Sequence, residues 1–240
     1  MKTGFVAVTG ASSGIGKATA ALFIEKGFNV LLIARRVERL EEFQGANIIK
    51  AQVDVTDEPA LKQAIADAEA RFGPVEAIVN NAGRMLLGDI SSQDSSEWKD
   101  MYAVNVIGVL NGMQAVLPSM IERKTGTIIN ISSIAGKKTF ADHAAYVGTK
   151  FAVHSISENV REEVAKHNVR VMTIAPGVVE TELLSHTTDE TIKENYTDWK
   201  QSIEGGLDPR TVAETIYFAF SQPQSVNIRE IALAPTRQQG

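Results

Sequence analysis

The stretch FVAVTGASSGIG, residues 5–16, contains the pattern that decides the fold. Its first five residues are apolar or β-branched and predict a buried strand. The glycines that follow predict a tight turn, and a helical pattern continues from about Gly14 to Glu25. A strand that passes through a glycine turn directly into a helix is typical of the start of a parallel α/β sheet.

The same alternation recurs along the rest of the chain. Helical patterns run from about 58 to 72, 98 to 123 and 146 to 167, and a short charged helix ends near Phe43. Apolar strands separated by such helices indicate a parallel sheet that is covered on both faces. We predict an α/β fold, a Rossmann-type doubly wound parallel sheet of about seven strands with helices on both faces, in one domain over residues 1–240. The further strands are predicted at 29–34, 47–54, 77–80, 126–132 and 169–175.

Residues 183–207 interrupt this alternation. The segment is polar and lies between a Pro-Gly turn and a new helix that begins near Asp208. An insertion at the carboxyl end of a strand is where such sheets place a cover over their ligand. We predict a substrate lid at about 183–207, and the alternative is a connection with no role.

The composition excludes several classes of protein. The chain has 240 residues, no cysteine, four scattered histidines and a formal net charge of −5. Disulfide frameworks and thiolate metal sites are therefore excluded, and we expect no metal. No Lys/Arg-rich run is present, so we expect no nucleic-acid or membrane partner. The N-terminal apolar run is too short for a signal peptide, and no apolar run approaches the roughly 18 residues of a membrane span, which predicts a cytoplasmic protein.

The glycine turn TGASSGIG, residues 9–16, is a candidate phosphate site. Glycines allow close backbone approach, and the unpaired N–H groups at a helix N-terminus attract a pyrophosphate. The turn therefore predicts a dinucleotide, although a plain strand-to-helix turn has the same glycines.

Two arginines follow the second strand. A carboxylate at this point usually binds the ribose hydroxyls of NAD, but the sequence here reads Ala34-Arg35-Arg36. Two guanidinium groups suit a 2′-phosphate, so we predict NADP(H) as the cofactor. The alternative is a solvated charge patch in which Arg35 or Arg36 pairs with Glu38 or Glu41.

Two further strand ends carry candidate nucleotide contacts. Asp54 follows the third strand and is predicted to accept from the adenine amine, although an acid there is also a routine helix cap. Asn80-Asn81-Ala82-Gly83 follows the fourth strand, where small residues would let the backbone pass close to a nucleotide. Taken alone, NNAG is also a common turn.

The stretch AAYVGTK, residues 144–150, places a phenol and an ammonium one helical turn apart. Residues four apart lie on the same face of a helix, so Tyr146 and Lys150 can share one site. Lowering a tyrosine pKa from about 10 to about 7 requires about 4 kcal/mol in favour of its anion. An ammonium about 4 Å away at an effective dielectric of about 20 supplies that order of energy. We therefore expect Lys150 to lower the pKa of Tyr146.

Together these motifs resemble one family. TGASSGIG, NNAG, Asn105 in VNVIG, Ser133 in NISSIAG, Tyr146-x-x-x-Lys150 and Pro176-Gly177 occur in the order and spacing of the classical short-chain dehydrogenases/reductases. The resemblance extends from Thr3 to about Leu233, and Ser133 precedes Tyr146 by thirteen residues as it does in that family.

The resemblance implies a catalytic tetrad of Asn105, Ser133, Tyr146 and Lys150. Tyr146 would exchange the proton, and Lys150 would hold the nicotinamide ribose as well as favour the phenolate. Ser133 would donate a hydrogen bond to the substrate oxygen. Asn105 would anchor a water molecule, although an asparagine inside a helix can equally serve packing or mark a kink.

The resemblance also implies the cofactor contacts. Pro176 to Thr181 match PGxxxT, whose threonine and backbone meet the nicotinamide carboxamide, while Pro-Gly alone is only a turn signal. The full cofactor-binding set is Gly10, Ser12, Ser13, Gly14, Ile15, Gly16, Arg35, Arg36, Asp54, Val55, Asn81, Ala82, Gly83, Tyr146, Lys150, Pro176, Gly177, Val179 and Thr181.

The substrate walls are expected at 84–88, 137–144, 178–180 and the lid. Lys137, Lys138 and His143 would tolerate an acidic substrate there, but such loop side chains usually face water. ARR-x-ERL and the ending NIREIALAPTRQ are similar to the branch that includes 3-hydroxy acid and serine dehydrogenases. The helices at 98–123 and 146–167 are those with which the family forms homodimers or homotetramers.

The function predicted from these motifs is an NADP(H)-dependent oxidoreductase that transfers a hydride between the nicotinamide and a small alcohol or carbonyl substrate. The alternative is a non-catalytic NADP(H)-binding redox-sensing or scaffold protein, a class that typically lacks the tyrosine or the lysine. Epimerases and dehydratases among the extended relatives carry a TGxxGxxG turn and a larger C-terminal domain. The turn here is TGxxxGxG, and we expect no such domain in this protein.

Overall fold

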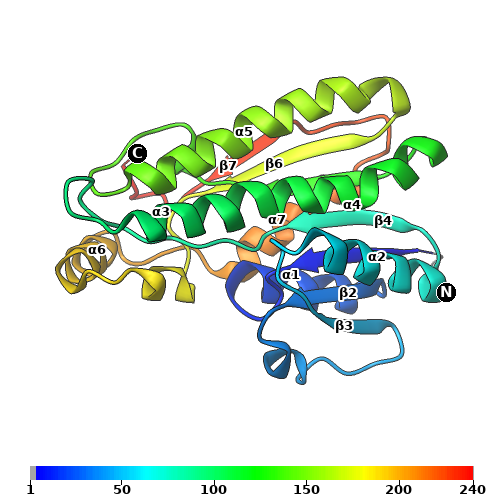
Figure 1. Ribbon diagram of the computed structural model, residues 1–240, viewed down its shortest axis with the longest axis horizontal. Coiled ribbons are helices and arrows are strands. Elements are labelled where there is room, and N and C mark those ends of the chain that lie inside the picture. The colour runs from blue at the N-terminus through cyan, green and yellow to red at the C-terminus, as the bar shows by residue number, and fades with distance from the viewer. Residues whose placement is uncertain (1–3, 240) are drawn as a thin grey trace.

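A seven-stranded parallel sheet forms the centre of the protein in a computed structural model that describes residues 4–239 (Figure 1). The ends of the predicted domain, residues 1–3 and 240, lie outside the described residues. The strand order is β3-β2-β1-β4-β5-β6-β7, and every pairing is parallel. The predicted fold class is confirmed. The strands are β1 Phe5–Thr9, β2 Asn29–Ala34, β3 Ile48–Gln52, β4 Val75–Asn80, β5 Thr127–Ile131, β6 Arg170–Pro176 and β7 Glu230–Leu233.

Helices cover both faces of this sheet (Figure 1). Successive residues of a strand point to opposite faces, so Phe5 and Ala7 join one core cluster while Val6 and Val8 join the other. The central strands β1 and β2 are buried on both faces, which is why their sequences are apolar runs without alternation. The first cluster contains α2 Glu58–Phe72, α4 Gly108–Arg123 and α5 Ala144–Val164, and the second contains α1 Gly14–Glu25 and α7 Pro209–Ser221.

The long helix predicted at 98–123 begins earlier than predicted and is interrupted by a turn of π-helix. It consists of α3 Ser95–Tyr102, a π-helical turn Ala103–Ile107 and α4. It begins earlier because the Asp94 side chain accepts from the Ser96 N–H at 2.8 Å and caps the helix. By length and composition alone Ser95–Arg123 would pass for a membrane span, but 56% of its most apolar window is buried inside the protein. It is a core helix.

From β1 the chain continues to β2 on one side of the sheet, and from β4 it continues to β5 on the other side. β1 and β4 are neighbours, so the direction of the winding reverses between them. Such a reversal opens a crevice at the carboxyl ends of the two strands, where ligands of doubly wound sheets bind. The predicted lid segment follows β6 and is folded, with a 3₁₀ turn at Glu182–His186 and the helix α6 Glu190–Ser202. Asp189 caps α6 by accepting from Ile192 N–H at 3.0 Å.

Candidate active site

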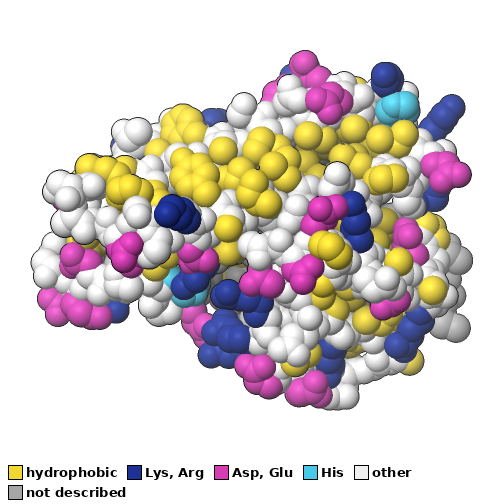
Figure 2. Space-filling model, viewed as in Figure 1, with side chains coloured by type: hydrophobic (Ala, Val, Ile, Leu, Met, Phe, Trp, Pro, Cys, Tyr) yellow, Lys and Arg dark blue, Asp and Glu magenta, His cyan; other side chains and the backbone are white. Residues whose placement is uncertain are grey.

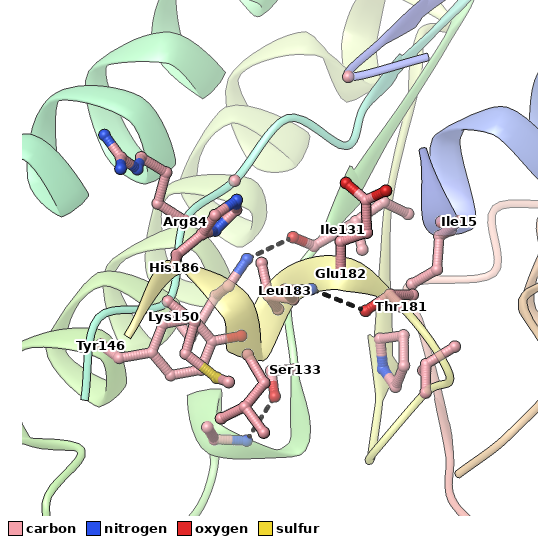
Figure 3. A pocket seen from close by; sticks show the side chains of 18 of the residues that line it. Ile15, Arg84, Ile131, Ser133, Tyr146, Lys150, Thr181, Glu182, Leu183 and His186 are labelled. Carbon is pink, nitrogen blue, oxygen red and sulfur yellow. Dashed lines mark hydrogen bonds between the residues drawn. The ribbon is translucent and has the colours of Figure 1, made fainter. Parts of the chain in front are cut away.

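A cavity of about 720 Å³ opens at the carboxyl ends of the strands (Figure 3). Residues from the ends of β1 to β6, from the start of α5 and from the lid segment line it. It brings together eighteen of the nineteen predicted cofactor residues and three of the four predicted catalytic residues. Gly16 and Asn105 do not line it. The lining residues predicted from the sequence are Gly10, Ser12, Ser13, Gly14, Ile15, Arg35, Arg36, Asp54, Val55, Asn81, Ala82, Gly83, Ser133, Tyr146, Lys150, Pro176, Gly177, Val179 and Thr181.

The glycine turn has the backbone that its sequence demands. Gly10 has φ 66° and Gly14 has φ 52°, in the left-handed region that favours glycine. A Cβ atom on Gly16 would clash with the carbonyl oxygen of Gly10, so Gly16 packs behind the turn and out of the cavity. Ser13 makes no side-chain hydrogen bond to α1, and no acidic side chain occupies its first turn. The positive end of α1 is therefore available to an anion.

Three arginines lie just after β2, at one side of the cavity. Arg35 Nη1 lies 3.6 Å from Asp54 Oδ2, and Arg36 Nη1 lies 3.3 Å from Glu182 Oε2. Arg39 Nη1 also pairs with Glu182, at 2.8 Å. The charge-patch alternative predicted that Arg35 or Arg36 pairs with Glu38 or Glu41. The two arginines pair with Asp54 and Glu182 instead. The sequence analysis missed Arg39, although it lies one 3₁₀ turn after Arg36.

Asp54 is fixed by its own loop. Its Oδ1 accepts from the Thr56 N–H at 2.9 Å and from the Thr56 hydroxyl at 2.8 Å. Burial raises the pKa of Asp54, but the hydrogen bonds from Thr56 and the charge of Arg35 outweigh it and hold the pKa below its usual value. The cap of α2 is Asp57, which accepts from Ala60 N–H at 3.0 Å. Asp54 is thus free of the capping role that its position in the sequence also allowed.

The NNAG segment at the end of β4 is hydrogen-bonded to the start of the glycine turn. The N–H groups of Asn81 and Ala82 donate to Thr9 Oγ1 at 2.9 and 3.1 Å, and Asn81 Nδ2 donates to Thr9 O at 3.0 Å. A Cβ atom on Gly83 would lie 3.9 Å from Lys150 Nζ. The motif therefore lies between the glycine turn and the start of α5.

Ser133, Tyr146 and Lys150 lie together on one side of the cavity (Figure 3). Tyr146 and Lys150 are one turn apart on α5, and Ser133 follows β5 with its Oγ accepting from Ala135 N–H at 3.1 Å. Lys150 Nζ donates to Ile131 O at 3.0 Å and lies 5.7 Å from the centre of the Tyr146 ring. Both side chains are buried, with Tyr146 6% exposed and Lys150 7% exposed.

The predicted lowering of the Tyr146 pKa is wrong for this structure. Burial raises the pKa of Tyr146 above its ordinary value, nearby Tyr196 raises it further, and a hydrogen bond with Ser133 only partly opposes them. Lys150 does not reverse the shift because its ammonium lies over the ring face and donates to Ile131 O. Burial lowers the pKa of Lys150 to about 8. At neutral pH the phenol is therefore neutral and able to donate its proton.

Asn105 lies behind the cavity in the π-helical turn and is 1% exposed. Its Oδ1 accepts from Arg84 N–H at 2.7 Å, and its Nδ2 donates to Arg84 O at 2.8 Å and to Thr149 Oγ1 at 3.1 Å. The side chain is thus bonded to the segment after β4 and to α5. These contacts match the packing and kink reading of this residue.

The PGxxxT segment packs directly on the glycine turn. A Cβ atom on Gly14 would lie 2.8 Å from Thr181 Cγ2. Thr181 Oγ1 accepts from Leu183 N–H at 3.3 Å and so begins the 3₁₀ turn of the lid segment. Gln238, which the sequence analysis missed, also lines the cavity and accepts from Val178 N–H at 2.9 Å.

The predicted substrate walls are only partly cavity walls. Lys137 pairs with Glu230 at 2.7 Å, and Lys138 lies over the Phe140 ring at 5.6 Å, and neither lines the cavity. His143 does line it and is mostly buried. The lid contributes Tyr196 and Trp199, which the sequence analysis missed although their spacing of three places them on one side of an amphipathic helix.

Comparisons with known proteins agree with this geometry. A family model described as short chain dehydrogenase matches residues 4–192. An uncharacterized oxidoreductase of Listeria monocytogenes, Lmo0432, is 41% identical over 247 aligned residues, covering 99% of this chain and 98% of that protein. The closed form of a serine dehydrogenase complexed with NADP+ is 33% identical with a TM-score of 0.91, covering 98% of this chain and 96% of that one. Serine dehydrogenase from Escherichia coli is 32% identical with a TM-score of 0.85, covering 98% of this chain and 100% of that one.

The resemblance predicted from the motifs is therefore confirmed, both by the family model and by relatives that match along nearly their whole length. This chain belongs to the short-chain dehydrogenase family.

Proposed function

We propose that this protein is an NADP(H)-dependent oxidoreductase that interconverts a small alcohol and its carbonyl compound, with Tyr146 as the general acid/base. The observation that carries the proposal is the grouping of Ser133, Tyr146 and Lys150 in the same cavity as the glycine turn and Arg36. The likeness to an oxidoreductase that is complexed with NADP+ supports it.

The residues present fit an NADP(H) molecule. The N-terminus of α1 would bind the pyrophosphate, because the left-handed glycines let the backbone approach it and no acidic side chain occupies the first turn. Arg35 and Arg36 would bind the 2′-phosphate. Asp54 and Val55 would contact the adenine, and Lys150 and Thr181 the nicotinamide end. NADPH supplies the hydride when it is bound.

The protein's own side chains supply the proton and stabilise the developing charge. Tyr146 holds a neutral hydroxyl at pH 7, so it can donate its proton to the carbonyl oxygen in a reduction. Ser133 is hydrogen-bonded with Tyr146 and would donate to the same substrate oxygen. The ammonium of Lys150 favours the phenolate that remains after the proton leaves. The presence of both Tyr146 and Lys150 in the cavity supports catalysis over a scaffold role.

We also infer a homodimer or homotetramer. Large apolar side chains of α3, α4, the π-helical turn and α5 are exposed: Tyr102 is 43% exposed, Ile107 48%, Leu110 37% and Phe151 42%. Figure 2 shows hydrophobic side chains gathered over α4 and α5 on one face. An apolar patch of this kind is typical of a surface that another subunit covers.

The test is the variant Tyr146→Phe in an NADPH-oxidation assay over aldehydes, ketones and 3-oxo acids. Loss of the proton donor should lower turnover about 100- to 10,000-fold, while the dissociation constant of NADPH measured by fluorescence changes little. Tyr217→Phe is the matched control, because Tyr217 lies on α7, packs against the other core cluster and does not line the cavity. Retained turnover in Tyr146→Phe would remove this tyrosine from the acid role.

A further inference from the structure

The cavity continues beyond Tyr146 into a region walled by aliphatic side chains. Met85 and Leu87, from the segment after β4, are 5% and 1% exposed and belong to the same apolar cluster as Tyr146. Leu183, Leu184 and Ile192 of the lid segment pack against this cluster and also line the cavity. The region next to the phenol is therefore apolar on both the sheet side and the lid side.

A chain of rings runs from the phenol to the lid helix. His143 lies 6.4 Å from Tyr146, 5.6 Å from Phe140 and 6.3 Å from Tyr196, measured between ring centres. Tyr196 in turn lies 5.2 Å from Trp199. All five rings line the cavity. The sides of these rings that face the cavity can pack against the aromatic ring of a ligand.

The cationic side chains of this wall are already paired. Arg84 forms an ion pair with Asp100, and its Nε is buried with no hydrogen-bond partner in the structure. Lys200 pairs with Glu180 at 2.8 Å. Each of these cations therefore already has a carboxylate partner in the protein.

The remaining titratable groups of the wall do not favour an anion either. Burial lowers the pKa of His143, and burial together with the charges of Arg84, Arg36 and Arg35 lowers the pKa of His186, so both imidazoles are neutral at pH 7. Asp142, which also lines the cavity, is an exposed carboxylate that repels an acid. A carboxylate in this region would lose its hydration and would have to compete with Asp100 or Glu180 for a cation.

We propose that the substrate is an uncharged carbonyl compound with an aromatic or branched apolar group beside the carbonyl, and that the acid-substrate preference of the 3-hydroxy acid and serine dehydrogenase branch does not extend to this chain. The inference rests on the proposed function, since it places the carbonyl oxygen at Tyr146 and Ser133. The carbonyl carbon accepts the hydride of NADPH and its oxygen takes the Tyr146 proton. The products are the alcohol and NADP+, with Tyr146 reprotonated from solvent.

The first experiment compares substrates that differ in charge or ring only. The full-length protein is assayed with NADPH and methyl benzoylformate, benzoylformate or methyl pyruvate. We expect kcat/KM for methyl benzoylformate to exceed that for benzoylformate at least 100-fold and that for methyl pyruvate at least 10-fold. Equal or faster turnover of benzoylformate would overturn the inference and leave the oxidoreductase proposal intact. Turnover of no carbonyl by protein that binds NADPH would overturn the oxidoreductase proposal itself.

A second measurement removes intrinsic carbonyl reactivity from the comparison. Methyl phenylacetate and phenylacetate carry the same ring and have no ketone to reduce, so their inhibition constants report binding alone. We expect the ester to bind at least 10-fold more tightly in the NADPH-loaded protein. Tighter binding of the acid would contradict an uncharged substrate.

A third measurement locates the preference in the ring chain. Trp199→Ala should raise the KM for methyl benzoylformate at least 10-fold and change the KM for methyl pyruvate less than twofold, because only the aryl group reaches the lid rings. Phe218→Ala is the matched control, since Phe218 is 55% exposed on α7 and does not line the cavity. An equal effect of Trp199→Ala on both esters would show that the rings do not select the substrate.

Discussion

Glu182 stands in the cavity beside the arginines that we assign to the 2′-phosphate, and replacing it with glutamine should tighten NADPH binding. Its carboxylate pairs with Arg36 at 3.3 Å and with Arg39 at 2.8 Å. The hydrogen bond from Arg39 holds the pKa of Glu182 below its usual value against a smaller opposing effect of burial, so the group is ionised at neutral pH. A 2′-phosphate must compete with this carboxylate for the guanidinium group of Arg36. Glu182→Gln removes the competing charge and keeps the shape of the side chain.

The size of the effect follows from exposure. Glu182 is 48% exposed, and its partners Arg36 and Arg39 are 40% and 42% exposed. Ion pairs this exposed contribute about 0.2 to 1 kcal/mol each. At the upper end of this range the Arg36 pair contributes about 1 kcal/mol, which corresponds to a dissociation constant for NADPH about fivefold lower. Screening lengths fall from about 8 Å at 0.15 M salt to about 3 Å at 1 M, so the gain should shrink at high salt.

The assay is fluorescence titration of NADPH and NADH with the wild type and Glu182→Gln at both salt concentrations. NADH lacks the 2′-phosphate, so its affinity should change less than twofold. Glu190→Gln is the matched control, because Glu190 is also on the lid segment but pairs with Lys193. Weaker NADPH binding in Glu182→Gln would refute the reasoning, since it would mean that the ion pairs hold the lid over the cofactor.

Three further predictions concern single side chains. NADPH should bind the wild type at least tenfold more tightly than NADH, and Arg36→Ala should remove most of that difference; equal affinities for the two cofactors in the wild type would contradict the assignment to the 2′-phosphate. Lys150 has a folded-state pKa of about 8, below that of an unfolded lysine, so its buried charge destabilises the fold below pH 8 and this cost disappears as the pH rises past about 10.5. The Tm of Lys150→Met relative to the wild type should therefore be higher at pH 7 than at pH 10.5. The opposite trend in thermal melts would show that the ammonium is not destabilised. Asn105→Ala leaves the buried backbone groups of Arg84 without their partner and should lower the free energy of unfolding by about 1 to 3 kcal/mol in urea titration, and an unchanged midpoint would count against its bonding role.

The fold was predictable because a strand that is buried on both faces of the sheet needs apolar residues at successive positions. Strands such as β1 and β2 are almost entirely apolar runs, and the helices between the strands have their own periodicity. The boundaries were less predictable. The helix begins at Ser95 because Asp94 caps it, and the capping signal Asp94-x-x-Glu97 stands in a polar stretch ahead of the apolar residues on which the prediction relied. The π-helical turn depends on tertiary bonds of Asn105, which no local pattern reports.

Some features of the candidate site were likewise predictable from the sequence, and others were not. Tyr146 and Lys150 share a helix face, and Ser133 follows the strand beside that helix, so their meeting was predictable from spacing and topology. The direction of the Tyr146 pKa shift was not, because it depends on burial and on where Lys150 Nζ points. The pairing of Arg36 with Glu182 joins residues 146 positions apart. The lid rings face inward only because α6 folds back over the cavity.

The hydrogen bonds of Asn105 have a consequence for how this pocket can be altered. Its amide pairs with both the N–H and the C=O of Arg84, as an adjacent strand would, and its third bond reaches Thr149, the neighbour of Lys150. The irregular segment that continues through Met85 and Leu87 thus keeps a fixed backbone path relative to α5. Its side chains can be exchanged for others of different size while that path is preserved. New substrate preferences are therefore accessible here by replacement of single side chains, without rebuilding the reaction centre.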